Sequence, residues 1–383
     1  MIEIWYAILV FVFTTYVVLD GRNFGAGALH LIVTKTAAER RQVVAAIGPL
    51  WSWHEVWLVA LGGVLFVAFP RFMATAFSGY YLALYLVLWS LILRGISLEV
   101  GGHIDNRLWQ GFWDFVFTVS NILLAVLFGT ALGNLARGVS LDSNGEFHLA
   151  FFTDFQVRGH TGLLDWYTIS MGLFTLVILA AHGATYLTLK TEGAVHERSQ
   201  WLTRRLWVAA CPGLVVITIE TWFVRPEFFN NMLHRPLAWL AVLTVLAGGA
   251  AIFTGIRSRM EFRAFSGSCV IIVGLLVAGA VSIFPVILRS TLDPEHSLTV
   301  YNSSASPKSL AVATVWWPIA LILAFCYFVF ISRRYRGEGE IIHRHTRILL
   351  NWAWSVRPPT PNGQNRLASV GKNPVGLCVP LLG

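Results

Sequence analysis

The sequence predicts an all-α protein, a polytopic membrane bundle of about nine transmembrane helices. Of its 383 residues, 56% are hydrophobic and only 13% are charged, whereas a soluble domain has roughly 45–50% apolar and about 25% charged residues. The apolar residues gather in blocks of about 20, the length of helix that crosses a bilayer core. The blocks are too long and too uniformly apolar for the alternating strands of a membrane barrel. This composition excludes a soluble enzyme or a nucleic-acid-binding domain as the first interpretation.

Nine blocks qualify as spans. They cover residues 4–19, 49–70, 72–93, 115–133, 164–189, 206–224, 237–256, 267–288 and 310–331. We interpret the first as a retained span, because no basic segment precedes it and Asp20-Gly21-Arg22 follows it in place of a small-residue cleavage site. The glycine pairs Gly62-Gly63 and Gly248-Gly249 predict close helix packing rather than phosphate-binding loops.

The net charge of +8 predicts an orientation. With the N-terminus outside, 21 of the 28 lysines and arginines lie on the inside and 7 on the outside. Positive residues accumulate on the cytoplasmic side of membrane proteins, so this bias predicts N-out and C-in, which requires an odd number of spans. Residues 1–336 are the predicted transmembrane bundle. Residues 337–383 are a predicted basic, weakly ordered cytoplasmic tail.

Ionisable groups within a bilayer are costly and usually line a cavity or a pathway. Glu55 lies about one turn inside the second predicted span, next to His54 and between Trp51 and Trp57. A glutamate beside a histidine suits a proton relay. The alternative is a belt of interfacial tryptophans with a glutamate that reaches toward the membrane surface.

A second group closes the third span, where Arg94 can pair with Glu99 or Glu55, or form an ordinary surface ion pair. Asp114 directly precedes the fourth predicted span and either caps that helix or belongs to a proton path. His182, deep in the fifth span, is either a haem ligand or a packed, hydrogen-bonded histidine. Glu220, deep in the sixth, is a structural or a relay residue.

Few residues suit a cofactor. Only His54 and His182 lie clearly within spans, and a haem held inside a bundle needs properly facing axial ligands. Four cysteines with no CxxC spacing predict neither a zinc nor an iron–sulfur site. If the protein belongs to a redox complex, the sequence places the redox centres in another subunit.

Motifs in order along nearly the whole chain resemble subunit II of the cytochrome bd-type quinol oxidases, including the cyanide-insensitive branch. The matching pieces are Asp20-Gly21 with Gly25 and Gly27, Gly48-Pro49-Leu50-Trp51, Glu55-Val56-Trp57-Leu58, Ala68-Phe69-Pro70, Ser78-Gly79-Tyr80-Tyr81, Arg94-Gly95 with Glu99, Trp113-Asp114, Gly133-Asn134 with Gly138, Gly162-Leu163-Leu164-Asp165-Trp166-Tyr167, His182-Gly183-Ala184-Thr185-Tyr186-Leu187 with Lys190-Thr191, Phe284-Pro285, and Ser297-Leu298-Thr299-Val300 with Ser303-Ser304.

The resemblance implies a partner, a haem-bearing subunit I, in the bacterial inner (cytoplasmic) membrane. The complex would oxidise quinol, reduce dioxygen to water and take protons from the cytoplasm. Haem b and haem d would belong to subunit I, and this subunit alone would bind no haem, supply no catalytic residue and hold no metal. It would support assembly and a proton and oxygen path. The resemblance leaves room for a bound quinone and for small accessory subunits.

The chain departs from the family pattern where protons are expected to move. Ser52 stands where the family usually has Asp, His54 where it has Asn, and Asp20-Gly21-Arg22-Asn23 replaces the familiar Asp-Gly-Phe-Asp. The predicted proton path comprises Glu55, His54, Ser52, Glu99 and Asp114. The predicted structural or interface residues are Asp20, Trp51, Trp57, Arg94, His182 and Glu220. The alternative functions are a divergent, assembly-only scaffold and a secondary transporter, although a transporter predicts inverted repeats and none is evident by eye.

Overall fold

The structure is a computed structural model that describes residues 1–48, 51–147, 150–153, 155–156 and 161–334. Within these ranges, nine helices are long and apolar enough to cross a membrane. This confirms the predicted all-α membrane bundle and its number of spans. The nine are α1 (Ile2–Ala28), α4 (Trp51–Ala68), α6 (Tyr81–Val100), α7 (Arg107–Arg137), α8 (Trp166–Lys190), α9 (Gly193–Val224), α11 (Pro236–Arg257), α12 (Glu261–Ile283) and α13 (Pro307–Arg334).

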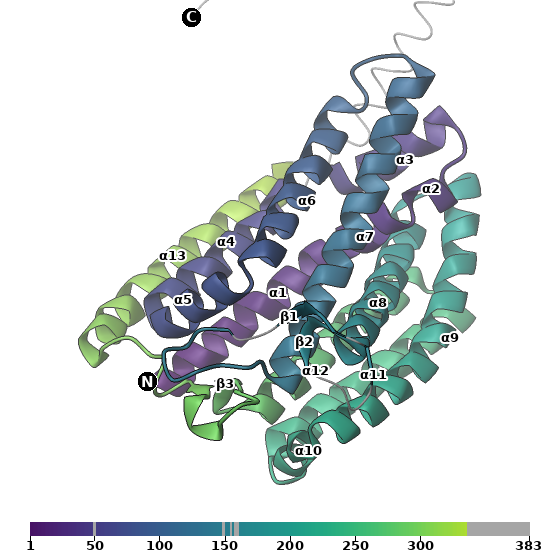
Figure 1. Cartoon of the computed structure of the whole chain (residues 1–383). Coiled ribbons are helices and arrows are strands. Elements are labelled where there is room, and N and C mark those ends of the chain that lie inside the picture. Colours follow the sequence, from purple (N-terminus) through teal and green to yellow (C-terminus); the bar gives the residue numbers. More distant parts are fainter. Residues whose placement is uncertain (49–50, 148–149, 154, 157–160, 335–383) are drawn as a thin grey trace, which may run out of the picture. The chain divides into compact units, whose positions relative to one another are not determined.

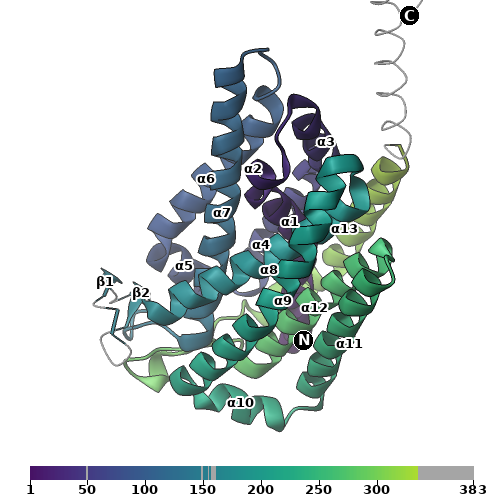
Figure 2. The ribbon, with the colours of Figure 1, turned by 90° about the vertical axis from the view of Figure 1, so that its right-hand side faces the viewer.

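Shorter elements join the spans at both ends of the bundle (Figures 1 and 2). Helices α2 (His30–Val33) and α3 (Ala37–Ile47) lie at the end where α6 meets α7, which we call the α3 end. Helix α10 (Pro226–Leu233) marks the opposite, α10 end. The remaining short elements are helix α5 (Pro70–Gly79), the 3-10 turn η2 (Pro294–His296), parallel strands β1 (Ala150–Phe152) and β2 (Gly162–Leu164), and antiparallel strands β3 (Val286–Leu288) and β4 (Leu298–Thr299).

Helix α1 packs against α4, α7, α8 and α12 (Figure 1). It crosses α8 at Gly25 and Gly183, where a Cβ on Gly25 would overlap the carbonyl oxygen of Leu179. Small residues at a crossing let two backbones approach, which is how helices associate within lipid. The crossing therefore fixes α1 against α8.

The structure supports the predicted glycine packing at Gly248 and leaves it a prediction at Gly62-Gly63. A Cβ on Gly248 of α11 would lie 2.8 Å from the backbone nitrogen of Ile271 in α12, so this glycine joins the two helices. Gly62 and Gly63 of α4 have no atom within 4 Å of an added Cβ among the described residues. Gly62 and Gly63 therefore make no close helix contact within the part of the chain that the structure describes.

Several helices extend beyond the predicted apolar blocks. α7 begins at Arg107 rather than at residue 115, because the side chain of Asn106 accepts hydrogen bonds from the backbone N–H groups of Leu108 and Trp109, at 2.8 and 3.3 Å. Asp114 is therefore in the third turn of α7, and the interpretation of Asp114 as a helix cap is wrong. Polar residues extend the helix here because they lie beyond the apolar part of the span.

The predicted span 72–93 is broken at Tyr80. α5 begins at Pro70, a favourable first helical residue, and ends before Tyr80, which has non-helical angles (φ −97°, ψ 16°). Tyr80 packs edge-on against Phe147, with ring centroids 4.9 Å apart. The membrane-crossing helix α6 therefore starts nine residues later than predicted and continues to Val100.

The predicted tail, residues 337–383, lies outside the described residues. The predicted boundary of the bundle at residue 336 and the N-out, C-in orientation stay predictions. Under that orientation the α3 end is the cytoplasmic end.

Candidate functional site

Charged and polar side chains meet inside the bundle toward its α3 end. The last third of α1, the first turns of α4 and the second half of α6 supply them. We call the five central residues the Asp20 cluster: Asp20 and Asn23 of α1, His54 and Glu55 of α4, and Arg94 of α6. All but Glu55 are buried.

Arg94 is the centre of this cluster. Its Nη1 and Nη2 donate to Oδ1 and Oδ2 of Asp20 at 3.0 and 3.1 Å, and Nη2 also donates to Oε1 of Glu55 at 2.7 Å. The guanidinium carbon lies 4.8 Å from the centroid of the Phe24 ring. Two-pronged Arg–carboxylate bonds are strong and directional, and a buried charge requires such partners. Arg94 thus ties α1, α4 and α6 together with two carboxylates and one cation.

His54 extends the cluster toward α8. Its Nδ1 lies 2.6 Å from the amide nitrogen of Asn23, which also donates to Asp20 at 3.0 Å. Its Nε2 lies 3.0 Å from Nη2 of Arg22, whose guanidinium covers the ring of Tyr186 at 4.5 Å. His54, which occupies the position where the family usually has Asn, is therefore connected to Asp20 through the side-chain amide of Asn23.

The other predicted residues of α4 and α6 lie around the cluster. Ser52 is exposed on this chain, as is Glu99, which accepts a hydrogen bond from the indole nitrogen of Trp51 at 3.3 Å. Arg94 pairs with Glu55 and not with Glu99. Trp57 packs one turn deeper, edge-on against Phe11, with ring centroids 6.2 Å apart.

Asp114 lies in a separate group near the α3 end. Its Oδ1 lies 2.9 Å from Nε2 of His30, and its Oδ2 lies 2.9 Å from Nε of Arg40. His30 is buried and packs edge-on against Phe117. His30 is not among the predicted site residues, because it falls between predicted spans. The recurrence of polar or small residues at 20, 23, 27 and 30, one helical face, is the signal that could have found it.

His182 and Glu220 are not part of either group. His182 is fully buried, with Nδ1 at 2.7 Å from Oγ of Ser268 and Nε2 at 3.1 Å from the carbonyl oxygen of Val18. Glu220 is half-buried in α9, and its Oε2 has no hydrogen-bond partner among the described residues.

The two histidines of the predicted spans do not fit a haem. Both ring nitrogens of His182 and both of His54 are engaged by neighbouring side chains or backbone. An axial bond to iron needs a free imidazole nitrogen. In this arrangement neither histidine offers a haem an axial nitrogen.

A salt bridge also closes the α3 end. Nη1 and Nη2 of Arg198 in α9 donate to the two carboxylate oxygens of Glu39 at 2.9 and 3.0 Å. Glu39 also completes a capping box with Thr36 at the start of α3. The Arg198 guanidinium and the backbone N–H of Lys35 hold the pKa of Glu39 at about 2.

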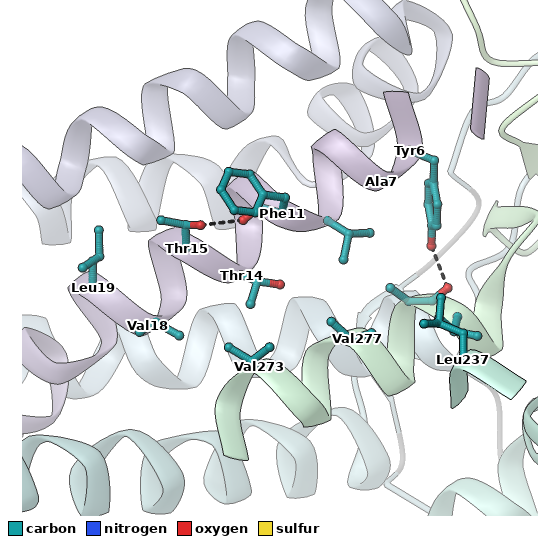
Figure 3. A pocket seen from close by; sticks show the side chains of 13 residues that line it. Tyr6, Ala7, Phe11, Thr14, Thr15, Val18, Leu19, Leu237, Val273 and Val277 are labelled. Atoms are coloured by element: carbon teal, nitrogen blue, oxygen red, sulfur yellow. Dashed lines mark hydrogen bonds between the residues drawn. The ribbon is translucent and has the colours of Figure 1, made fainter. Parts of the chain in front are cut away.

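An apolar groove of about 510 Å³ runs beside α1, between α1, α11 and α12 (Figure 3). Tyr6 closes one end and donates to the carbonyl oxygen of Ala280 at 2.8 Å. Thr14 and Thr15 are the other polar side chains in a lining of aliphatic and aromatic groups. None of the predicted site residues lines the groove. It suits an apolar chain and not a charged ligand.

Known proteins match this chain over most of its length. The family profile described as "Cytochrome bd terminal oxidase subunit II" matches residues 1–334. The Haemophilus influenzae protein named "Probable cytochrome oxidase subunit 2" is 29% identical over 363 residues, covering 88% of this chain and 94% of that protein. The Escherichia coli protein named "Cytochrome bd-I ubiquinol oxidase subunit 2" is 28% identical over 379 residues, covering 90% and 97%.

The fold agrees with a solved structure. A chain in the structure of the bd oxidase from Geobacillus thermodenitrificans has a TM-score of 0.66 and 16% sequence identity, covering 88% of this chain and 98% of that one. This likeness concerns the fold alone. The family profile covers the described helices from α1 to the end of α13, so this multi-pass membrane protein belongs to the cytochrome bd terminal oxidase subunit II family.

Proposed function

We propose that this chain is the non-haem subunit of a terminal quinol oxidase in the bacterial inner membrane. Its partner would be a haem-bearing subunit I, and the complex would couple quinol oxidation to the reduction of dioxygen to water. The family match over residues 1–334 carries this proposal. The engaged nitrogens of His54 and His182 support the placement of haem b and haem d in the partner.

Co-purification tests this function. The chain is expressed with its neighbouring gene, isolated through a tag on this chain, and examined by visible spectroscopy and quinol-dependent oxygen uptake. A coloured, two-subunit complex that consumes oxygen is the expected result. A colourless protein without a partner would overturn the proposal. A coloured complex whose turnover is unchanged by every substitution below would favour an assembly-only scaffold.

Within this complex, the chain would supply part of a proton path from the cytoplasm. The candidates are Glu55, His54, Ser52, Glu99 and Asp114. The geometry supports a path because the Asp20 cluster joins titratable groups from three helices below the α3 end. Exposed Glu99 lies next to Trp51, which starts the same helix as Glu55. Ser52 carries no carboxylate, so Glu55, His54 and Glu99 would take over the role of the usual Asp.

Neutral substitutions test the path. Glu55→Gln and Glu99→Gln keep the side-chain shape but cannot release a proton, so oxygen uptake by the assembled complex should fall by about tenfold or more. Glu227→Gln at the α10 end is the matched control, since Glu227 is 64% exposed and far along the chain from the cluster. Unchanged oxygen uptake in both test variants would refute the path while leaving the family function intact.

The groove beside α1 is the place that we propose for a quinone tail. Its apolar lining would accept an isoprenoid chain, while the redox headgroup would need partners outside that lining. Extraction of the purified complex should then yield bound quinone. Substitution of Val277→Trp, which fills the groove, should reduce its amount.

A further inference from the structure

Where α1 and the short helix α2 pack against α7, three buried polar atoms have no hydrogen-bond partner among the described residues: Nδ1 of His30 in α2, and Oγ1 of Thr118 and Oδ1 of Asn121 in α7. Their side chains are only 1%, 6% and 0% exposed. Buried polar atoms in native proteins are nearly always paired with protein or ordered water, because an unpaired one costs about 1–3 kcal/mol. Three such atoms along one helix contact indicate a small file of bound water.

The three atoms follow one another along matching helix faces. On α7, positions 114, 118 and 121 are spaced by four and three residues, so they share a face. Asn121 lies against α1 at Gly27, where an added Cβ would overlap its amide group. Water bound to these atoms would lie along the contact between the Asp114–His30 pair and Gly27.

From Gly27 the Asp20 cluster is one helical turn away. Asn23, four residues earlier, donates to Asp20 at 3.0 Å. Four residues of α-helix rise by roughly 6 Å, a distance that one or two water molecules bridge. Water bound along this stretch would connect His30 near the α3 end with the cluster inside the bundle.

The partners of His30 determine which of its nitrogens carries the proton. The Asp114 carboxylate can only accept, and Arg40 holds its other oxygen at 2.9 Å. Nε2 of a neutral His30 must therefore carry the hydrogen that faces Asp114. Nδ1 is left with a bare lone pair, buried and without a hydrogen-bond partner among the described residues. The charged groups beside His30 are the Asp114 carboxylate, 2.9 Å from Nε2, and Arg40, which pairs with the other oxygen of that carboxylate.

We propose that His30 is a proton-holding residue of this subunit, positioned by Asp114, and that it exchanges protons with the Asp20 cluster through the file of Thr118, Asn121 and bound water. The proposal rests on the proposed function, because quinol oxidation with oxygen reduction creates the demand for protons. The step is balanced: a water-borne proton binds to Nδ1 and later leaves from Nδ1, and only that N–H bond forms and breaks.

The test uses the complete two-subunit oxidase and follows oxygen uptake and proton uptake across a pH series. Gln at position 30 can still donate to Asp114 but cannot hold a proton. His30→Gln should therefore slow both rates by about tenfold and change the shape of the pH profile. His196→Gln is the matched control: His196 also faces a carboxylate, Glu261 at 3.3 Å, but its Nδ1 is occupied by the carbonyl oxygen of Thr188. This variant should behave as wild type.

Thr118→Val tests the file without touching the pair. It keeps the side-chain shape and removes the hydroxyl, so a threefold or greater slowing in an assembled, normally coloured complex supports the proposal. Wild-type rates and pH profiles in both His30→Gln and Thr118→Val would overturn it. If Glu55→Gln slows turnover while these two do not, the proton path of the proposed function stands and the role of His30 falls. If His30→Gln fails to assemble, Thr118→Val alone decides.

Discussion

Arg94 donates to both carboxylate oxygens of Asp20, a residue 74 positions earlier in the chain, and the pair is buried. Glu55 adds a second carboxylate on the same guanidinium. Buried ion pairs contribute little net stability as long as they are intact, but the loss of one partner leaves an uncompensated charge. This pair therefore controls how tightly α1 and α6 are held.

Arg94→Gln should destabilise the assembled protein strongly. Asp20 and Glu55 would lose their shared cation, a change that costs roughly 3–5 kcal/mol for buried pairs. The measurement is the midpoint of thermal unfolding of the purified complex, together with its yield. Arg71→Gln removes a positive charge from an exposed residue of α5 and should be nearly neutral. An equal loss of stability in both variants would show that the removal of any positive charge, rather than the loss of the Arg94–Asp20 pair, is responsible.

Gly25→Ala should disrupt the crossing of α1 and α8. The added methyl group overlaps the Leu179 carbonyl, and overpacking of this kind costs about 1–3 kcal/mol. Gly62→Ala is the control, since its Cβ would meet no described atom within 4 Å. In a helix interior that change should stabilise by roughly 0.5–1 kcal/mol. The midpoint of thermal unfolding should therefore fall in Gly25→Ala and rise in Gly62→Ala. A Gly25→Ala variant as stable as wild type would contradict the crossing.

The Glu39–Arg198 bridge should make the α3 end sensitive to acid. The pKa of Glu39 is lowered from 4.5 to about 2, so the folded protein binds this proton less tightly than the unfolded chain. The bridge then contributes fully above about pH 4.5 and is lost as the pH falls toward about 2.

Unfolding of Glu39→Gln and wild type over that pH range measures the effect. Wild type should be the more stable at neutral pH, and the difference should shrink on acidification. Asp105→Asn, at an exposed carboxylate of the same end, should show no such convergence. A difference between Glu39→Gln and wild type that does not depend on pH would exclude the bridge as its cause.

Reporter proteins fused after Gly337 test the predicted N-out, C-in orientation. A fluorescent reporter that folds only in the cytoplasm should be active there, and a phosphatase that folds only outside should be inactive. The opposite pattern would reverse the assignment of the α3 end. The proton path would then open away from the cytoplasm.

The sequence predicts the number and kind of spans well because a bilayer imposes a minimum apolar length on each of them. It predicts their ends poorly. Asp20 lies after the first apolar block, yet α1 continues through it, because Arg94 and Asn23 satisfy a carboxylate that hydropathy alone assigns to a loop. Similarly, Asn106 starts α7 two turns before the apolar block begins.

The candidate site was predictable in part. Glu55 and Arg94 stand out because charges are rare within spans, and the structure pairs them. The choice between Glu55 and Glu99 as the partner of Arg94 depends on how α4 and α6 are rotated, which spacing within one helix does not define. His30 required the short α2 beside α7, a tertiary contact with no hydropathy signature.

The separation of Asp20 and Arg94 along the chain has a consequence for biogenesis. α1 leaves the ribosome first, and at roughly 5–20 residues per second the 74 residues to Arg94 follow about 4–15 s later. During that interval Asp20 can be met by polar groups of its own helix, such as the side-chain amide of Asn23, but not by a cation from α6. The carboxylate buried on α1 therefore acquires its cation only after α6 has been synthesised, so the amino-terminal helix cannot be electrostatically complete before that point.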